Sequence, residues 1–152
     1  MKILWTDGSA DPNPGPGGWA VIEEIENHPK DQLDDQWRPV AIGKEENTTN
    51  IRMEGTAIRE AIKYGIKASE SVEIHTDSEF WVNVLTKWAP AWKRNGWVKK
   101  SGPIKNLDLV QELYQLYTSY DVKIIWTRGH VGTVLNELAD EWATRARLGE
   151  TL

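Results

Sequence analysis

The 152-residue chain contains no cysteine. This absence excludes disulfide bonds, thiolate zinc sites and a cysteine nucleophile. No run of about 18 apolar residues exists, so no segment is predicted to cross a membrane. Residues 1–7 lack the apolar stretch and the small-residue cleavage site of a signal peptide. We therefore expect a cytoplasmic protein, and the length fits one domain over residues 1–152.

Acidic residues are absent between Phe80 and Leu107, although the whole chain has a net charge of −5. Taken alone, that net charge argues against a nucleic-acid partner. The same segment is rich in basic residues, namely Lys87, Lys93, Arg94, Lys99, Lys100 and Lys105. The charges are thus segregated, and an acidic chain of this kind can still present a basic surface to nucleic acid.

The spacing of apolar residues predicts the order of secondary structure. Strands are expected at 2–7, 19–25, 40–43, 71–76 and 122–127, and helices at 53–67, 78–88, 109–117 and 135–146. Turn-forming residues predict loops at 11–18, 26–36 and 128–133. Three successive strands, followed by strands that alternate with helices, predict an α/β fold (α+β mixed). We expect a five-stranded mixed sheet that opens with an antiparallel meander and has helices packed on both faces.

Carboxylates occur at unusual places in this pattern. Asp7 and Asp77 end the first and fourth predicted strands, Glu54 lies in the first turn of the first helix, and Asp140 lies within the last helix. Neighbouring strand ends would bring Asp7 and Asp77 together, and packed helices could add the other two. Clustered carboxylates raise one another's pKa values, and divalent cations relieve that repulsion. All-oxygen ligands suit magnesium or manganese, and paired ions serve in-line phosphodiester cleavage.

Each carboxylate also has an ordinary structural explanation. An Asp at a strand end commonly forms a turn or caps a helix. Glu54 could complement a helix dipole. Asp140 could pair with Arg145 or Arg147 on the surface. The positions alone leave the metal site and these alternatives open.

Five ordered motifs resemble type-1 ribonucleases H over nearly the whole chain, from about Ile3 to Arg147. They are Asp7-Gly8-Ser9 with residues 13–19, residues 48–54, residues 76–78, residues 92–97 with 105–109, and residues 129–132 with 136–140. The resemblance implies a ribonuclease H-like fold and a magnesium-dependent endonuclease that cuts the RNA strand of RNA–DNA hybrids, with manganese as a substitute ion. It also implies a free-standing prokaryotic or phage-like protein. We expect a monomer with no obligatory protein partner.

The same resemblance assigns roles to individual residues. The implied metal ligands are Asp7, Glu54, Asp77 and Asp140. His130, in a glycine-flanked loop, is implied in proton transfer or product release, and a histidine that titrates near neutral pH suits either task. The alternative is that His130 is a satisfied structural histidine.

Hybrid recognition is implied for a larger set of residues. Gly8, Ser9, Asn13 and Asn50 would read the 2′-hydroxyls of the RNA strand. Thr49 and Asn106 would bind a DNA phosphate, and Asn136 lies one helical turn from Asp140. A basic handle would contact the DNA backbone through Lys93, Arg94, Lys99 and Lys100. Its tryptophans, Trp92 and Trp97, could stack on deoxyriboses, although packing against the core is the commoner role of such residues.

The chain departs from the family pattern at three places on the binding side. Glu79 stands where bacterial relatives commonly carry Gln, and Asn47 stands where the phosphate pocket often has Arg. The acidic segment 25–38 is longer than expected. We expect these departures to weaken the binding of the hybrid and to leave the chemistry intact.

Three alternatives to this function differ from it in the sequence features that they predict. A nuclease or strand transferase of the same superfamily would lack the loop at 129–132 and the basic handle. A non-catalytic hybrid-binding module would have lost at least one of the four acids. A piece of a reverse-transcriptase polyprotein remains an alternative, although the initial Met1 favours a free-standing chain.

Overall fold

A computed structural model describes residues 1–28, 37–128 and 134–152. The chain forms one five-stranded sheet in the order β3-β2-β1-β4-β5. β1 (Lys2–Ala10), β2 (Gly15–Glu23) and β3 (Pro39–Thr48) pair antiparallel, whereas β4 (Val72–Thr76) and β5 (Val122–Trp126) run parallel to β1. The predicted mixed sheet with an opening meander is confirmed.

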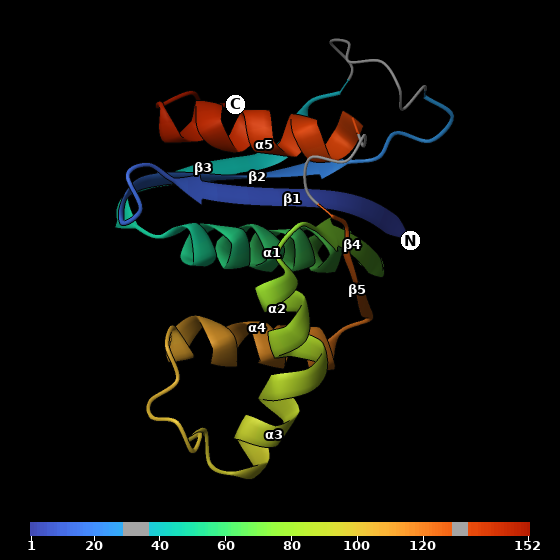
Figure 1. The fold of residues 1–152 in the computed structure, drawn as a ribbon. Helices are drawn as coiled ribbons and strands as arrows, with labels where there is room; N and C mark the ends of the chain where they lie inside the picture. Colours follow the sequence, from blue (N-terminus) through green and yellow to red (C-terminus); the bar gives the residue numbers. More distant parts are fainter. Residues whose placement is uncertain (29–36, 129–133) are drawn as a thin grey trace.

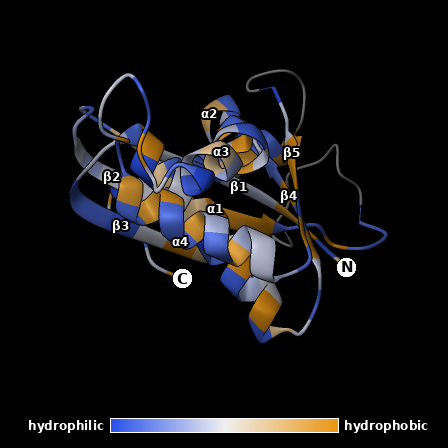
Figure 2. Ribbon diagram, turned by 90° about the horizontal axis from the view of Figure 1, so that it is seen from below, coloured by the Kyte–Doolittle hydropathy of each residue, from blue (hydrophilic) through white to orange (hydrophobic). Residues whose placement is uncertain are grey.

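Helices cover both faces of this sheet, as Figure 1 shows. Helix α5 (Val134–Arg147) lies on one face. Helix α1 (Asn50–Lys67) lies on the other, with α2 (Glu79–Asn83), α3 (Ala89–Arg94) and α4 (Leu107–Ser119) beyond it. Figure 2 shows apolar and polar residues interspersed along α4, and its buried residues Leu109, Val110 and Leu113 pack into the core. Within the described part of the chain, no helix is both long and apolar enough to cross a membrane.

The core is divided by the sheet into two clusters. Leu4 belongs to the cluster on the α1 side, whereas Trp5 packs with Leu135, Leu138 and Ala139 of α5 on the other side. Successive residues of a strand point to opposite faces, and both faces of β1 are covered. Consequently every residue from Leu4 to Gly8 is buried.

Several elements differ from their predicted bounds: β1 extends to Ala10 and β3 to Thr48, and α1 begins at Asn50. Residues 15–18 were predicted as part of a loop, but they begin β2, because their glycines allow close contacts that a side chain would block. A Cβ on Gly18 would lie 2.3 Å from the carbonyl oxygen of Ala143 in α5. The helix predicted to stop at Trp88 instead continues through a π-helical segment, η1 (Val84–Trp88), into α3. Pro90 is tolerated there because it lies in the first turn of α3.

Candidate active site

Two neighbouring parallel strands carry Asp7 and Asp77. Thr6 of β1 is in register with Thr76 of β4, so the next residue of each strand is an aspartate. Asp7 is only 6% exposed, and Asp77 is half-buried just after β4 ends. The structure therefore places the two carboxyl groups side by side at one end of the sheet, as the sequence pattern predicts.

Asp7 has an environment that disfavours its charged form. Burial, followed by the negative charge of Asp77, raises the pKa of Asp7 to about 9. The backbone N–H of Gly8 donates to Asp7 Oδ1 at 2.8 Å and partly opposes this shift. Asp140 adds further negative charge and a hydrogen bond between the two carboxyl groups.

Helix α1 brings Glu54 to the same place from one face of the sheet. Gly8 makes this approach possible, because a Cβ there would lie 2.2 Å from the carbonyl carbon of Met53 and 2.5 Å from the nitrogen of Glu54. Burial, with a contribution from Asp77, raises the pKa of Glu54 to about 7, while a hydrogen bond with Ser78 opposes the shift. The helix begins at Asn50, so Glu54 lies beyond its first turn, contrary to the sequence prediction. This position weakens the helix-dipole explanation of Glu54.

Helix α5 brings Asp140 from the opposite face. Asp140 itself is exposed, yet it acts on the pKa of Asp7, which shares the α5 side of β1 with Trp5. Arg145, a predicted alternative partner of Asp140, pairs instead with Glu141 at 3.9 Å and Glu150 at 3.4 Å. Asn136, predicted beside Asp140, is buried in the same helix.

The four carboxylates thus meet in pairs: Glu54 with Asp77, Asp77 with Asp7, and Asp7 with Asp140. No three acidic or histidine side chains are already gathered at metal-ligand spacing within residues 1–28, 37–128 and 134–152. The chemistry of the donors nevertheless fits a hard divalent cation, because all are carboxylate oxygens. The repulsion that raises the pKa of Asp7 is the interaction that such a cation would relieve.

Ser78 supports this arrangement, and the sequence analysis gave it no role. Its hydroxyl accepts the backbone N–H of Trp81 at 3.2 Å and so caps α2, and it also hydrogen-bonds Glu54. Trp81 is fully buried, and its indole N–H donates to the carbonyl of Ile51 in α1 at 2.7 Å. A serine before a helix is a recognisable cap, but its bond to a distant Glu54 is visible only in three dimensions.

The residues predicted to read the RNA strand lie beside the end of β1. Asn50 Oδ1 accepts the backbone N–H of Ala10 at 2.6 Å, and Asn13 Oδ1 accepts the backbone N–H of Asn50 at 3.1 Å. Ser9 lies next to Ala10 in β1. These amides therefore also hold the local backbone together, which is the ordinary role of such residues in turns.

The predicted phosphate-binding residues Thr49 and Asn106 are linked through Arg52. Thr49 caps α1 by accepting the backbone N–H of Arg52 at 3.2 Å, and the guanidinium of Arg52 donates to Asn106 Oδ1 at 3.2 Å. The same guanidinium forms a bidentate pair with Asp108 at 3.0 and 3.1 Å. No local sequence pattern predicts this link, because it joins residues more than fifty positions apart.

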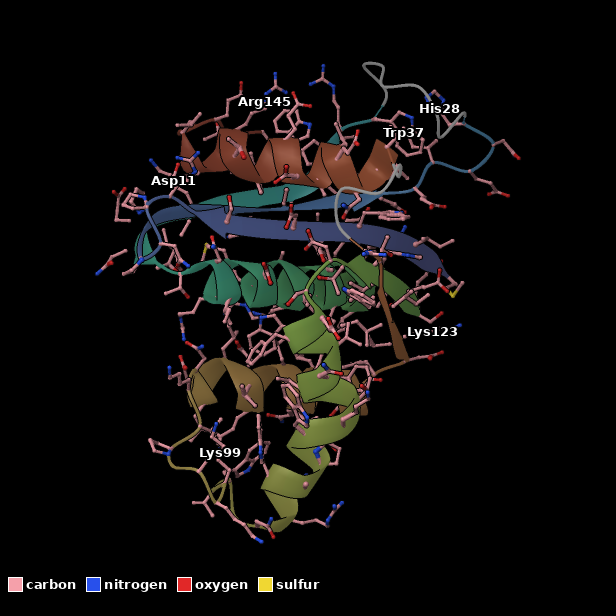
Figure 3. The ribbon with its side chains drawn as sticks, viewed as in Figure 1. Asp11, His28, Trp37, Lys99, Lys123 and Arg145 are labelled. Carbon is pink, nitrogen blue, oxygen red and sulfur yellow. The ribbon has the colours of Figure 1, made fainter. Side chains whose placement is uncertain are left out.

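The basic handle, residues 88–100, extends away from the sheet (Figure 3). Lys93, Arg94, Lys99 and Lys100 are all exposed. Trp92 and Trp97 instead pack partly against the core. The backbone N–H of Trp97 donates to the carbonyl of Trp92 at 2.7 Å. The structure thus gives these tryptophans the packing role that the sequence analysis favoured.

Glu79 is exposed in the first turn of α2, directly after Ser78. His130 lies outside the described residues, so its predicted role stays a prediction.

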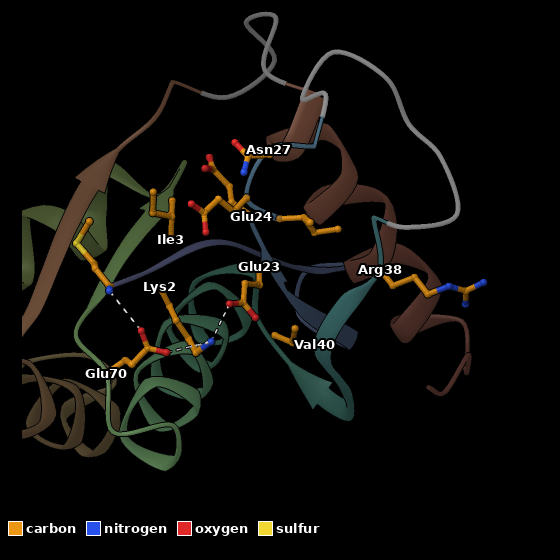
Figure 4. Close-up of a pocket in the computed structure, with 11 residues that line it drawn as sticks. Lys2, Ile3, Glu23, Glu24, Asn27, Arg38, Val40 and Glu70 are labelled. Carbon is orange, nitrogen blue, oxygen red and sulfur yellow. Dashed lines mark hydrogen bonds and ion pairs between the residues drawn. The ribbon is translucent and has the colours of Figure 1, made fainter.

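A cavity of about 840 Å³ lies at the other end of β1, around its N-terminus (Figure 4). Four of its charged groups form ion pairs with one another. Lys2 Nζ pairs with Glu23 at 2.9 Å and with Glu70 at 3.4 Å, and the N-terminal amine pairs with Glu70 at 3.3 Å. This mutual pairing gives no reason to place the chemistry here.

The sheet order and the acidic strand ends define a nuclease of the ribonuclease H-like class. The RNase H family model matches residues 1–147. The chain therefore belongs to the RNase H family.

Individual relatives agree with this assignment. The chain is 42% identical to the ribonuclease H of Dichelobacter nodosus, with 94% of this chain and 89% of that protein covered. It is 40% identical to the ribonuclease H of Methylorubrum extorquens over 95% of this chain, but spans only 59% of that longer protein. Among solved structures, LC9-RNase H1, a type 1 RNase H with the type 2 active-site motif, has a TM-score of 0.74 and 30% identity, with 99% of this chain and 74% of that chain covered.

Proposed function

We propose that the chain hydrolyses the RNA strand of RNA–DNA hybrids, using magnesium ions held by Asp7, Glu54, Asp77 and Asp140. One observation carries the proposal: carboxylates from both faces of the sheet meet at adjacent strand ends, where repulsion and burial raise the pKa of Asp7 to about 9. Strongly shifted pKa values of buried, neighbouring carboxyl groups cluster at functional sites. Manganese, with similar oxygen preference, is expected to replace magnesium.

The protein groups around the carboxylates have distinct tasks. The N–H of Gly8 orients Asp7, and the hydrogen bond with Ser78 orients Glu54. Asp140 reaches Asp7 from the other face. Bound magnesium would supply an activated water for attack on the phosphorus and stabilisation of the leaving oxygen. His130 is proposed to move a proton or to assist product release, as a histidine that titrates near neutral pH can do.

Substrate recognition follows from the residues around this site. Gly8, Ser9, Asn13 and Asn50 are proposed to contact the RNA strand, whose 2′-hydroxyls donate and accept hydrogen bonds. Asn136 and Glu79 are proposed to border the same strand. Thr49 and Asn106, held together by Arg52, would bind a DNA phosphate, and the exposed cations of the basic handle would follow the DNA backbone. We expect residues 1–152 to act as one domain and as a cytoplasmic monomer.

The direct test is cleavage of an RNA–DNA hybrid, duplex RNA and duplex DNA side by side, with and without magnesium. The unaltered protein should cut only the hybrid's RNA strand, and only with the ion. Asp77→Asn should reduce cleavage by at least about a hundredfold, because losing one preorganised electrostatic contact to the transition state costs about a hundred- to a thousandfold in kcat. Circular dichroism should show an unchanged fold.

Asp121→Asn is the matched control, because Asp121 is exposed just before β5 and takes no part in the site. This variant should cleave like the unaltered protein. Normal turnover by Asp77→Asn would rule out the ligand assignment. Cleavage of duplex DNA by the unaltered protein would rule out the substrate assignment.

A further inference from the structure

Trp126 ends β5 with its indole 45% exposed, beside the turn that carries Asp77. The indole N–H donates to the main-chain carbonyl oxygen of Asp77 at 3.2 Å. The register of β4 and β5 ends with the pair Thr76 and Trp126, so Asp77 is the first residue beyond the ladder. The side chain of Trp126 therefore continues the sheet's hydrogen bonding by one residue, to the carbonyl of a proposed metal ligand.

The backbone on both sides of Asp77 is fixed by other hydrogen bonds. The N–H of Thr127 donates to the carbonyl of Thr76 at 2.7 Å. The N–H of Ser78 donates to the hydroxyl of Thr76 at 3.1 Å, and Ser78 caps α2. The bond from Trp126 acts on the carbonyl end of the peptide group that joins Asp77 to Ser78, whose N–H end is the one held by Thr76.

Apolar burial does not by itself explain a tryptophan at this position. Tryptophan gains most of its stabilising effect when its large ring is covered, as Trp81 is in the core of this protein. Trp126 leaves nearly half of its surface in water. Its single polar atom, by contrast, is used on Asp77.

We propose that Trp126 is a positioning residue for the nuclease reaction, whose indole N–H fixes the turn that carries Asp77. The hydrogen bond limits rotation of the Asp77–Ser78 peptide, and so keeps the Asp77 carboxylate beside Asp7 and Glu54. Reacting groups must be held within fractions of an ångström, so a small turn displacement would slow the reaction more than it would weaken substrate binding. The inference rests on the proposed function.

Trp126→Phe tests the inference, because it keeps an aromatic ring and removes the N–H. We expect kcat to fall by about 3–10-fold, the loss of one hydrogen bond, with the KM for the hybrid changed less than about twofold. Magnesium should raise the melting temperature of the substrate-free protein. The magnesium concentration at which half of this rise is reached should be higher in Trp126→Phe by a similar factor. A purely structural role would lower the melting temperature and leave both quantities unchanged.

Trp142→Phe is the matched control. The ring of Trp142 lies on α5 at 4.5 Å from the Arg145 guanidinium, and it is partly buried like many surface tryptophans. It should keep kcat and the magnesium response. A control that lost both to the same extent as Trp126→Phe would overturn the specific role of Trp126.

A measurement on the unaltered protein covers the case in which Trp126→Phe fails to fold. In a ¹H–¹⁵N spectrum, the indole resonance of Trp126 should shift as magnesium is added, whereas that of Trp142 should shift much less. An unmoved Trp126 resonance, or unchanged kcat and magnesium response in Trp126→Phe, overturns the inference. If the unaltered protein neither cleaves the hybrid nor responds to magnesium, the proposed function fails instead.

Discussion

Glu79 is expected to stabilise the fold and to weaken the binding of the substrate. It occupies the first turn of α2, where a negative charge stabilises the helix dipole. It is also exposed, directly after the Asp77-Ser78 pair, and so lies next to the proposed site of phosphodiester cleavage. A carboxylate there can only accept hydrogen bonds, and it repels phosphate.

Glu79→Gln should therefore bind the hybrid more tightly. We expect the KM at low salt to fall by about 2–5-fold, the size of one exposed charge interaction, with kcat little changed. The difference should shrink as salt is added, because exposed charges are screened. Steady-state kinetics at two salt concentrations measure it.

Glu70→Gln is the control for this substitution. Glu70 is exposed at the N-terminal end of β1, where it pairs with Lys2 and the N-terminal amine, far along the strand from Asp7. The KM of this variant should match that of the unaltered protein. An unchanged KM in Glu79→Gln would show that residue 79 does not face the nucleic acid.

For single residues, the sequence predicted the site residues that lie at strand ends. It missed the residues whose hydrogen-bond partners lie on a different helix or strand. Asp7 and Asp77 could be predicted because parallel neighbours place their ends together. Ser78 and Arg52 could not, because their partners Glu54 and Asn106 are brought near only by packing. A local pattern carries no information on which way a side chain turns between two elements.

At the scale of elements, glycines decide how closely the helices approach the sheet. The absence of a side chain at Gly8 lets α1 approach β1 closely and place Glu54 at the site. Gly18 allows the same close approach of α5, which carries Asp140. The sequence analysis treated residues 15–18 as a loop because glycine and proline commonly mark turns. In β2 the same residues serve close packing, and the turn signal gave the wrong structure.

The basic handle is the element that should set the salt dependence of binding. Reversing two of its exposed cations, with Lys93→Glu and Arg94→Glu together, should raise the KM for the hybrid and leave kcat nearly unchanged. Each lost phosphate contact lowers the slope of log affinity against log salt by roughly 0.7–0.9. Binding measured over a series of salt concentrations should therefore give a slope that is smaller by about 1.4–1.8 for two lost contacts.

The same reversal at Lys63 and Lys67 on α1 provides the comparison. Both lysines are exposed and carry the same charge, but they lie in the C-terminal part of α1, away from Glu54 and the strand ends. Their reversal changes the net charge equally. If the two double variants had equal slopes, the handle would have no specific contact with the hybrid.

Taken as a whole, the molecule assembles its site from a sheet that is covered on both sides. Alternation along β1 sends Leu4 to the α1 side and Trp5 to the α5 side, so the strand must be buried on both faces. The same geometry gives Asp7 its low exposure and lets Glu54 and Asp140 approach from opposite faces. The order of elements predicted this layering, whereas the extent to which burial raises the pKa of Asp7 could come only from the packed structure.

This burial couples the stability of the whole fold to pH. An acid whose pKa is higher in the folded chain holds its proton more tightly when folded, so stability falls as pH rises. For Asp7 the loss begins above the usual value of 3.8 and is complete above about 9. For Glu54 it runs from about 4.5 to about 7. The pKa of Asp108 is instead lowered in the folded chain. Its contribution to folding stability is therefore lost only as the pH falls below the usual value of 3.8.

Without divalent ions, the free energy of unfolding should therefore fall by at least about 2 kcal/mol between pH 5 and pH 9, since one pKa unit corresponds to about 1.4 kcal/mol. Urea unfolding in a chelator at several pH values measures this change.

Asp7→Asn should remove most of this dependence of the unfolding free energy on pH, and it should be more stable than the unaltered protein at pH 9. Asp121→Asn should keep the pH dependence. Magnesium binds ionised carboxylates and should restore stability at pH 9 in the unaltered protein but much less in Asp7→Asn. If the free energy of unfolding without metal stayed level or rose from pH 5 to pH 9, the electrostatic account of the site would be contradicted. Ionisation of the buried carboxyl groups would then not destabilise the fold.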